Sequence, residues 1–387
     1  MVVNRLPARR RLPWAVLLGA LAVAPAFQNP EADARRFEEI RARYQRGEPV
    51  SPEERQWAQR YRQAQQQKKG AAPSSAEQKK LVEEFLRSHP PRESTGLVPL
   101  TDLGTQRYQG EQGGLYPGGS NVPPPAHQKA GFALARQIAP LDREGRPAPD
   151  GKIVLLSIGM SNTTMEFQTF QKLAAAEPNL NPRLVLVDGA QGGQTAHITA
   201  DPNARFWNVV AERLQNAGVT SAQVQVAWVK QANAGPREPF PTEAKRLQAD
   251  LVNTLHNLHD KFPNLKIAYL SSRIYGGYAL TPLNPEPHAY EGAFAVKWVI
   301  ADQISGRPEL NFDPAKGTVR APWVAWGPYL WADGVKGRKV DDLVWVKEDF
   351  VERDRTHPSD SGRRKVAELL LNFLKSDPTA RPWFLAR

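Results

Sequence analysis

The sequence predicts an α/β fold, namely a three-layer α/β/α sandwich on a mostly parallel sheet, preceded by a helical N-terminal extension. Two observations lead to this prediction. Short apolar runs rich in branched residues recur in the later part of the chain, with helical patterns between several of them, whereas the early part is rich in Arg, Glu and Gln. This alternation favours parallel strands that helices cover on both faces.

Four apolar runs predict the strands of the sheet: residues 151–158, 183–187, 224–229 and 266–270. Each is short and bounded by polar or turn-forming residues, as is typical of a buried strand. Helices are expected at 128–138, ahead of the first strand, and at 243–261, between the third and the fourth.

Residues 1–26 have the features of a signal peptide. Four arginines and no acidic residue accompany the apolar stretch 14–23, which is followed by Ala24-Pro25-Ala26. The stretch is short for a bilayer span, so we expect cleavage after Ala26, with an uncleaved anchor as the alternative. In both cases the body of the protein is expected to be exported, to the periplasm or the cell exterior, with no stable membrane span after cleavage.

Residues 27–94 form the predicted helical extension, and residues 95–387 form the predicted globular domain. Helices are expected near residues 32–46, 52–68 and 76–88. The second begins with Ser51-Pro52-Glu53-Glu54, a capping box with proline at the first helical position. Residues 65–75 are expected to be a flexible connection. A chain that begins near residue 94 is therefore expected to fold.

The composition argues against several classes of partner. The formal charge of +11 falls by four when residues 1–26 are removed, and the remaining excess is spread along the chain, so no nucleic-acid partner is expected. His256 and His259 share one helical face, but no third ligand is evident, so neither a metal nor another cofactor is expected. The chain has no cysteine and must be held together by its core.

Three residues provide the nucleophile, the base and the orienting acid that a serine hydrolase needs. Ser161 directly follows the first predicted strand, and Asp354 precedes His357 by three residues ahead of a helix. A hydroxyl attacks when a base takes its proton and a third group orients that base. Because ligands bind at the carboxyl ends of strands in an open α/β sheet, the position of Ser161 favours a catalytic function.

Two further strands end in groups that could donate hydrogen bonds to an oxyanion. Gly192 and Gly193 follow the second strand, and Asn233 follows the third. A glycine lets the backbone N–H approach a ligand closely, and an asparagine amide donates without adding charge. We prefer Gly193 to Gly192 because it directly precedes Gln194 and Thr195.

These blocks resemble the SGNH hydrolase superfamily, which is named for a serine, a glycine, an asparagine and a histidine on four segments. The resemblance covers roughly residues 95–387 and implies a flavodoxin-like sandwich. It implies Ser161 as nucleophile, His357 as base and Asp354 as its orienting acid, with an oxyanion hole from Ser161, Gly193 and Asn233. Two motifs differ from the usual family pattern. The chain has Gly159-Met160-Ser161 in place of G-D-S, and Gln231-Ala232-Asn233-Ala234 in place of G-x-N-D, so the substrate class is not carried over.

Substrate contacts are expected from the loops at the same sheet edge. Arg273 and Tyr275 follow the fourth strand, and His197 follows the glycine turn. Core packing is the alternative for Tyr275, and an exposed turn for His197. The number of tryptophans slightly favours a carbohydrate, although core packing is the commoner role: Trp298, Trp323, Trp326 and Trp331.

The sequence therefore predicts an exported serine esterase that acts on a small-molecule or polysaccharide ester, with acetyl esters of carbohydrates as one candidate. A lipase or phospholipase on the same scaffold is the first alternative. A binding protein that kept the fold and lost activity is the second.

Overall fold

The computed structural model describes residues 30–45, 51, 53–54, 57–58, 61 and 75–386. The chain divides into two compact units, Met1–Gln78 and Lys79–Arg387. The predicted signal peptide lies outside the described residues. No helix among the described residues is both long and apolar enough to cross a lipid bilayer.

The first unit contains helix α1 (Pro30–Gln45), which confirms the first predicted helix. The Ser51 hydroxyl accepts a hydrogen bond from the Glu54 amide (3.1 Å), and the Glu54 carboxylate accepts one from the Ser51 amide (2.9 Å), which confirms the predicted capping box. Arg43 of α1 pairs with Glu54 at 2.8 Å, and the Phe37 and Tyr61 rings lie 5.3 Å apart. Most of the predicted helix 52–68 lies outside the described residues.

The second unit is built on a sheet of five parallel strands in the order β4-β3-β5-β6-β7. The strands are β3 (Ile153–Gly159), β4 (Leu184–Asp188), β5 (Val224–Lys230), β6 (Ile267–Ser271) and β7 (Trp323–Trp326). The sequence predicted the first four. It did not predict β7, because four residues with a tryptophan at each end are too short to show a strand pattern.

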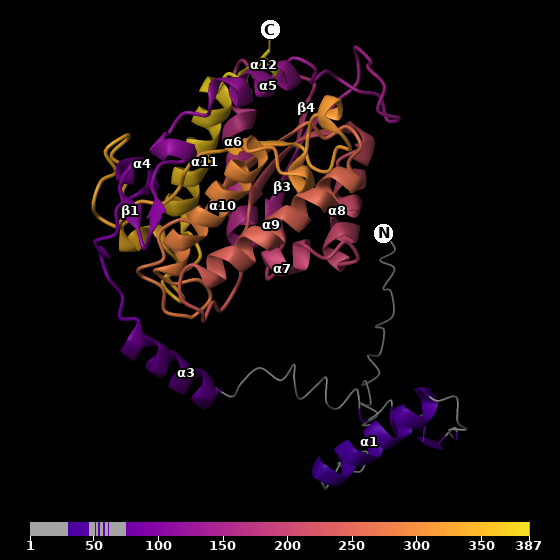
Figure 1. Ribbon diagram of the computed structural model, residues 1–387, viewed down its shortest axis with the longest axis vertical. Coiled ribbons are helices and arrows are strands. Elements are labelled where there is room, and N and C mark those ends of the chain that lie inside the picture. Colours follow the sequence, from indigo (N-terminus) through magenta and orange to yellow (C-terminus); the bar gives the residue numbers. More distant parts are fainter. Residues whose placement is uncertain are drawn as a thin grey trace, which may run out of the picture. The chain divides into compact units, whose positions relative to one another are not determined.

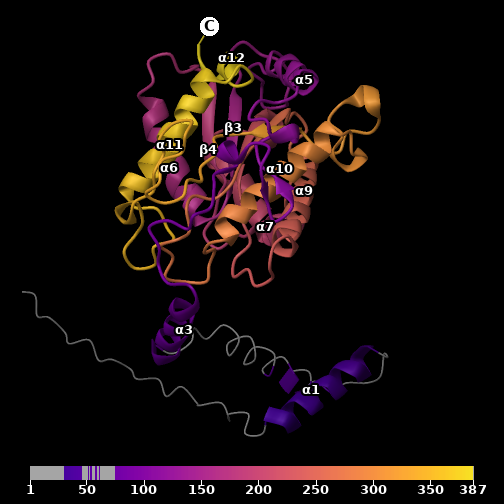
Figure 2. The same cartoon turned by 60° about the vertical axis from the view of Figure 1, so that its left-hand side comes forward.

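Helices cover both faces of this sheet. The helices from residue 75 onward are α3 (Ser75–Ser88), α4 (Leu100–Leu103), α5 (Pro125–Ala135), α6 (Ser161–Ala175), α7 (Ala196–Thr199), α8 (Arg205–Asn216), α9 (Thr242–Lys261), α10 (His288–Ile304), α11 (Asp360–Ser376) and α12 (Arg381–Phe384). Figures 1 and 2 show α6 and α11 on one face and α9 and α10 on the other. A small hairpin joins β1 (Arg107–Tyr108) to β2 (Glu111–Gln112). The predicted three-layer α/β fold is confirmed.

Apolar helix faces hold the layers together. On α6, Phe167 and Phe170 are fully buried, and the Phe167 ring stacks 6.0 Å from that of Trp228 in β5. On the opposite face, Leu247 and Leu251 of α9 are buried at helical spacing. Each large apolar side chain buried in this way contributes about 1.5–3 kcal/mol to stability.

Within the second unit, Asp333 holds the segment that precedes residue 97. This carboxylate is only 2% exposed and accepts hydrogen bonds from the Ser94 hydroxyl (2.6 Å), the Thr95 amide and hydroxyl (both 2.6 Å) and the Gly96 amide (2.9 Å). The Arg92 amide donates to the Gly277 carbonyl at 2.8 Å. The domain boundary predicted near residue 94 therefore falls inside a docked segment, and the compact unit begins earlier, at Lys79.

A truncation series tests this boundary. We expect a chain that begins at Ser75 to keep its stability, whereas a chain that begins at Leu97 should lose about 3 kcal/mol or more in free energy of unfolding, because Asp333 loses its four hydrogen bonds to residues 94–96. Urea denaturation of the two chains measures the difference. Equal stabilities would mean that the docked segment is dispensable and that the boundary near residue 94 stands.

Candidate active site

The candidate site lies where the order of the strands changes direction. The chain passes from β3 outward to β4 and then returns to β5 on the other side of β3. Ligands of open α/β sheets bind outside the carboxyl ends of the strands at such a point. Ser161 lies there, because β3 ends at Gly159 and α6 begins at Ser161. As a first helical residue, it has a backbone N–H without an intrahelical acceptor.

Ser161, His357 and Asp354 form one chain of hydrogen bonds. The Ser161 Oγ lies 2.8 Å from the His357 Nε2, and the His357 Nδ1 lies 3.0 Å from the Asp354 Oδ2. The serine and the histidine are 196 residues apart in the sequence. The structure thus brings together the three residues that the sequence singled out, in the order that nucleophilic catalysis requires.

The loop that carries the acid and the histidine is held from several sides. The Asp354 Oδ1 accepts hydrogen bonds from the amides of Thr356 (3.0 Å) and His357 (2.9 Å). The Asn162 side chain donates to the Thr356 carbonyl at 3.0 Å, and the Leu280 amide donates to the Asp354 carbonyl at 3.0 Å. The loop is therefore attached to the start of α6 and to the loop after β6.

Asp354 is favoured as a carboxylate. Burial by itself raises the pKa of this group, but the hydrogen bonds from the His357 and Thr356 amides and from the His357 ring outweigh it and lower the pKa below the ordinary value. An ionised Asp354 accepts a hydrogen bond from the Nδ1–H of His357, so that the unprotonated Nε2 faces Ser161.

The turn that contains Gly192 and Gly193 lies beside the serine. A Cβ on Gly192 would lie 4.0 Å from the Ser161 Cβ, whereas a Cβ on Gly193 would meet nothing within 4 Å. Gly193 has a φ of 74°, which favours glycine. In the part of the chain that the structure describes, the amides of both glycines lack an acceptor. The preference for Gly193 over Gly192 is thus not supported by proximity to the serine.

Asn233 follows β5 at the same sheet edge, and its side chain is already bound within the protein. Its Nδ2 donates to the Asp250 Oδ2 at 2.8 Å, and its Oδ1 accepts from the His197 amide at 3.1 Å. One of the two protons on Nδ2 is therefore engaged, and the second has no acceptor among the described residues.

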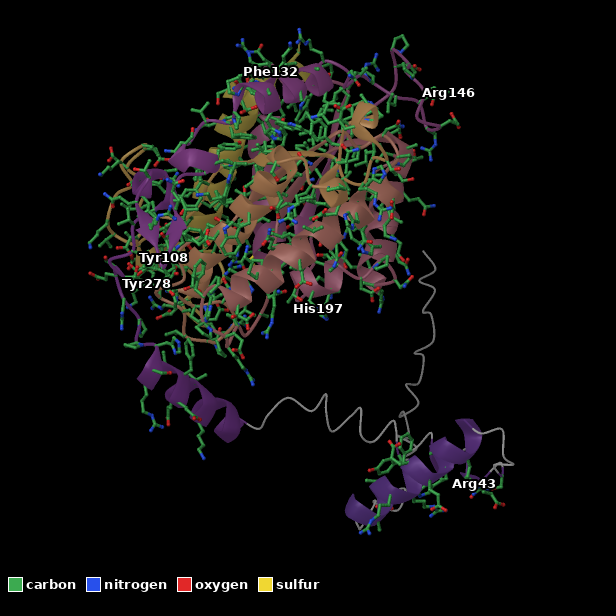
Figure 3. The ribbon with its side chains drawn as sticks, in the orientation of Figure 1. Arg43, Tyr108, Phe132, Arg146, His197 and Tyr278 are labelled. Carbon is green, nitrogen blue, oxygen red and sulfur yellow. The ribbon has the colours of Figure 1, made fainter. Side chains whose placement is uncertain are left out.

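The three predicted substrate contacts differ in their surroundings. The Tyr275 ring is 1% exposed and its hydroxyl donates to the Arg92 carbonyl at 2.8 Å, so this residue packs in the core and anchors the docked segment rather than facing a ligand. Arg273 is 4% exposed, and its Nε is buried without a described acceptor. The His197 side chain is 85% exposed and lies at the surface in Figure 3.

The four tryptophans are buried, and His256 lies close to a backbone carbonyl oxygen. All four tryptophans considered above are 8% exposed or less, so their number does not support a carbohydrate ligand. The His256 Nε2 lies 2.7 Å from the Glu309 carbonyl oxygen. The described residues contain no group of three or more His, Cys, Asp or Glu side chains that could hold a metal ion.

Sequence reasoning missed a buried ion pair beneath the site. Lys230, the last residue of β5, donates to both carboxylate oxygens of Glu166 on α6, at 2.8 and 2.6 Å, and neither side chain is more than 1% exposed. Burial lowers the pKa of Lys230 to about 8 and raises that of Glu166, while their mutual attraction opposes both shifts. The signal was a lysine at the end of an apolar strand and a glutamate on an apolar helix face.

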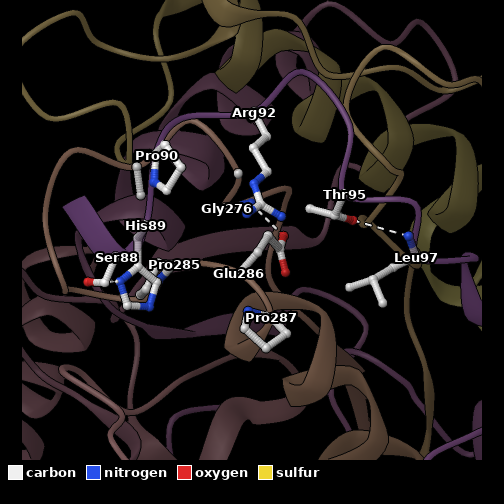
Figure 4. Close-up of a pocket in the computed structure, with 12 residues that line it drawn as sticks. Ser88, His89, Pro90, Arg92, Thr95, Leu97, Gly276, Pro285, Glu286 and Pro287 are labelled. Atoms are coloured by element: carbon white, nitrogen blue, oxygen red, sulfur yellow. Dashed lines mark hydrogen bonds between the residues drawn. The ribbon is translucent and has the colours of Figure 1, made fainter. Parts of the chain in front are cut away.

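A cavity of about 360 Å³ lies between the docked segment and the loop after β6. Figure 4 shows Arg92 from the segment and Glu286 from the loop among its lining residues. Burial raises the pKa of Glu286 to about 7, although hydrogen bonds from the Trp331 ring and the amides of Gly276 and Tyr290 oppose the shift. This carboxylate accepts three hydrogen bonds from protein donors. Ser161 and His357 are not among the lining residues.

No protein-family model matches the sequence, and no curated protein matches it. Solved structures with a similar fold include YxiM from Bacillus subtilis, with 11% identity over 59% of this chain and 58% of that chain (TM-score 0.33). The salicylyl-acyltransferase SsfX3 from a tetracycline biosynthetic pathway has 16% identity over 60% and 58% of the two chains (TM-score 0.32). The periplasmic domain of a lipopolysaccharide acetyltransferase from Salmonella ser. Paratyphi A has 12% identity over 64% and 94% (TM-score 0.32). This likeness concerns the fold alone.

Removing the lysine of the ion pair is expected to destabilise the protein. Lys230→Met leaves Glu166 buried without a partner and should lower the free energy of unfolding by about 3–5 kcal/mol at neutral pH. Because burial raises the Glu166 pKa, the loss should be smallest below the ordinary pKa of glutamate, about 4.3, and should grow as the pH rises through the raised value.

Urea denaturation at several pH values measures this effect. The control is Lys172→Met, on the exposed side of α6, the helix that carries Glu166. The control should change stability by no more than about 0.5 kcal/mol. A similar effect of both substitutions, or a Lys230→Met effect that does not vary with pH, would contradict the interpretation that Lys230 stabilises the buried Glu166 carboxylate.

Proposed function

We propose that this protein is a serine esterase that hydrolyses carboxylic esters through an acyl-enzyme intermediate. The observation that carries the proposal is the continuous hydrogen-bonded chain from the Ser161 Oγ through His357 to Asp354, with distances of 2.8 and 3.0 Å. It lies at the carboxyl end of β3, beside backbone amides that have no described acceptor. A nucleophile, a base and an orienting acid in this geometry are the requirements for acyl transfer to serine.

The reaction follows from the positions of these atoms. The Ser161 Oγ attacks the ester carbonyl carbon while the His357 Nε2 takes the hydroxyl proton, which gives a tetrahedral intermediate and an imidazolium that Asp354 stabilises. As the bond to the alcohol oxygen breaks, His357 returns the proton to that oxygen and the acyl group stays on Ser161. His357 then takes a proton from water, the hydroxide attacks the acyl carbon, and the acid leaves as Ser161 regains its proton.

Charge on the carbonyl oxygen would be stabilised by donors at the start of α6 and on the neighbouring loops. We assign these to the Ser161 amide, the amides of the Gly192–Gly193 turn and the second proton of the Asn233 Nδ2. Gly192 is included with Gly193 because a Cβ on Gly192 would lie 4.0 Å from the Ser161 Cβ. The positive end of the α6 dipole adds to the same effect.

Export and substrate class belong to the same proposal. Export is supported by the signal-like pattern of residues 1–26. The substrate is a small-molecule or polysaccharide ester. Two of the predicted contacts remain candidates, because the His197 side chain is exposed and the buried Arg273 Nε has no described acceptor. A set of acetylated sugars and synthetic esters of increasing acyl length would identify the preferred acyl group and alcohol, and would separate an acetyl esterase from a lipase.

Removal of the nucleophile tests the proposal. We expect Ser161→Ala to lower the rate of ester hydrolysis by roughly 10³-fold or more, because the serine and the histidine act as a unit. The melting temperature should be nearly unchanged. Ser305→Ala, at an exposed serine that follows α10, serves as the control and should keep full activity. Hydrolysis by the Ser161→Ala protein at the rate of the control would contradict the proposal.

Removal of the Asn233 amide tests the oxyanion hole. We expect Asn233→Ala to lower kcat by roughly 10²- to 10³-fold with little change in KM, because the donor stabilises charge that develops only in the transition state. Steady-state kinetics on one ester separates the two constants. An unchanged kcat with a raised KM would mean that Asn233 contacts the ground-state substrate instead.

A further inference from the structure

We infer that Asp250 of α9 is a positioning residue that fixes the orientation of the Asn233 amide for the oxyanion hole. This inference rests on the proposed function, because it assigns a task to Asn233 in ester hydrolysis. Asp250 lies 17 residues after Asn233, and nothing in its surrounding sequence marks it as part of a site.

The contacts around the Asn233 side chain leave only one orientation of its amide. The His197 backbone N–H, at 3.1 Å, is a donor and requires the amide oxygen opposite it. The Asp250 carboxylate, at 2.8 Å, is an acceptor when ionised and requires the amide nitrogen. A flipped amide would face a donor with a donor and an acceptor with an acceptor. The two neighbours therefore specify which end of the amide is which.

This arrangement engages one N–H of the Asn233 Nδ2 and leaves the other N–H available to a ligand. Because the amide is planar, fixing the oxygen and one N–H also fixes the direction of the second N–H. Asn233 is partly exposed and follows β5, which ends at the same sheet edge as β3. A donor that is already oriented loses little freedom when charge develops on the carbonyl oxygen, and this preorganisation is the main source of stabilisation in an oxyanion hole.

The loop around Asn233 is held at neighbouring backbone groups as well. The Ala196 amide donates to the Ala232 carbonyl at 3.0 Å, and the Asn284 side chain donates to the Asn233 carbonyl at 3.1 Å. These contacts place the backbone. They leave the rotation of the Asn233 side chain to its own two partners, and of these only Asp250 contributes a side chain.

The Asp250 carboxylate makes no second hydrogen bond within the part of the chain that the structure describes. Among the described residues, the Asn233 amide is the only group within hydrogen-bond distance of its carboxylate. The His197 Nδ1 lies 3.7 Å away, beyond that distance. Asp250 lies in the interior of α9 (Thr242–Lys261), next to the buried Leu251, so its carboxylate does not cap the helix. A carboxylate with a single partner is well suited to act through that partner.

A double-mutant cycle tests this inference. The wild-type protein, Asp250→Ala, Asn233→Ala and the double variant are compared by steady-state kinetics on one ester. We expect Asp250→Ala to lower kcat roughly 10- to 100-fold with KM changed less than about twofold, because a misdirected donor loses its effect mainly in the transition state. In the Asn233→Ala background the same change should lower kcat no further.

Two controls separate positioning from a general structural role. Asp250→Asn keeps an oxygen that can accept from the Asn233 Nδ2, so it should restore kcat to within about threefold of the wild type. Asp260→Ala removes an exposed carboxylate from the same helix and should leave kcat and KM unchanged. Melting temperatures show that each variant is folded, and Asp250→Asn keeps the test valid should Asp250→Ala fail to fold.

Several outcomes would overturn the inference. They are an equal loss of kcat in both backgrounds, an effect confined to KM, or an Asp250→Asn protein as impaired as a folded Asp250→Ala protein. These results are distinct from a failure of the proposed function, which would appear as a wild-type protein that hydrolyses no ester or a Ser161→Ala protein that keeps its activity. In that case the inference would fall together with the function on which it rests.

Discussion

The parallel pairing of β3 with β5 determines where the candidate catalytic groups lie. Gly159 at the end of β3 is opposite Lys230 at the end of β5, so the residues that follow each strand leave the sheet at the same level. The nucleophile comes after the first of these ends and the amide of Asn233 after the second. A shift of this register by one residue would displace the two strand ends by about 3.3 Å relative to each other.

The third part of the site depends on packing between helices. His357 is placed by the loop ahead of α11, and α11 packs against α6 on the same face of the sheet. The bond from Asn162 to the Thr356 carbonyl joins the residue after the nucleophile to the residue before the histidine. The short distance between the Ser161 Oγ and the His357 Nε2 is thus maintained by contacts on both sides of it.

Charged groups below the sheet edge have a related effect. The ion pair of Lys230 and Glu166 joins the end of β5 to the first turns of α6, and the Thr163 hydroxyl donates to the Lys230 carbonyl at 2.8 Å. These contacts limit movement of the helix that begins with the candidate nucleophile. A buried ion pair adds little net stability, because desolvation offsets the attraction, but it favours one arrangement of its two elements over others.

The sequence by itself determined the fold class, four of the five strands of the sheet, and the serine, histidine and aspartate that the structure joins. These features are local, because apolar periodicity defines a strand and the short Asp354–His357 spacing defines a turn. Tertiary structure alone decided that the glycine turn lies beside Ser161, that Tyr275 packs in the core, and that the segment around Ser94 docks on Asp333. The contact of Asp250 with Asn233 and the pairing of Lys230 with Glu166 also came only from the tertiary structure. The physical reason is that each depends on contacts between residues distant in sequence, which packing establishes and local pattern does not record.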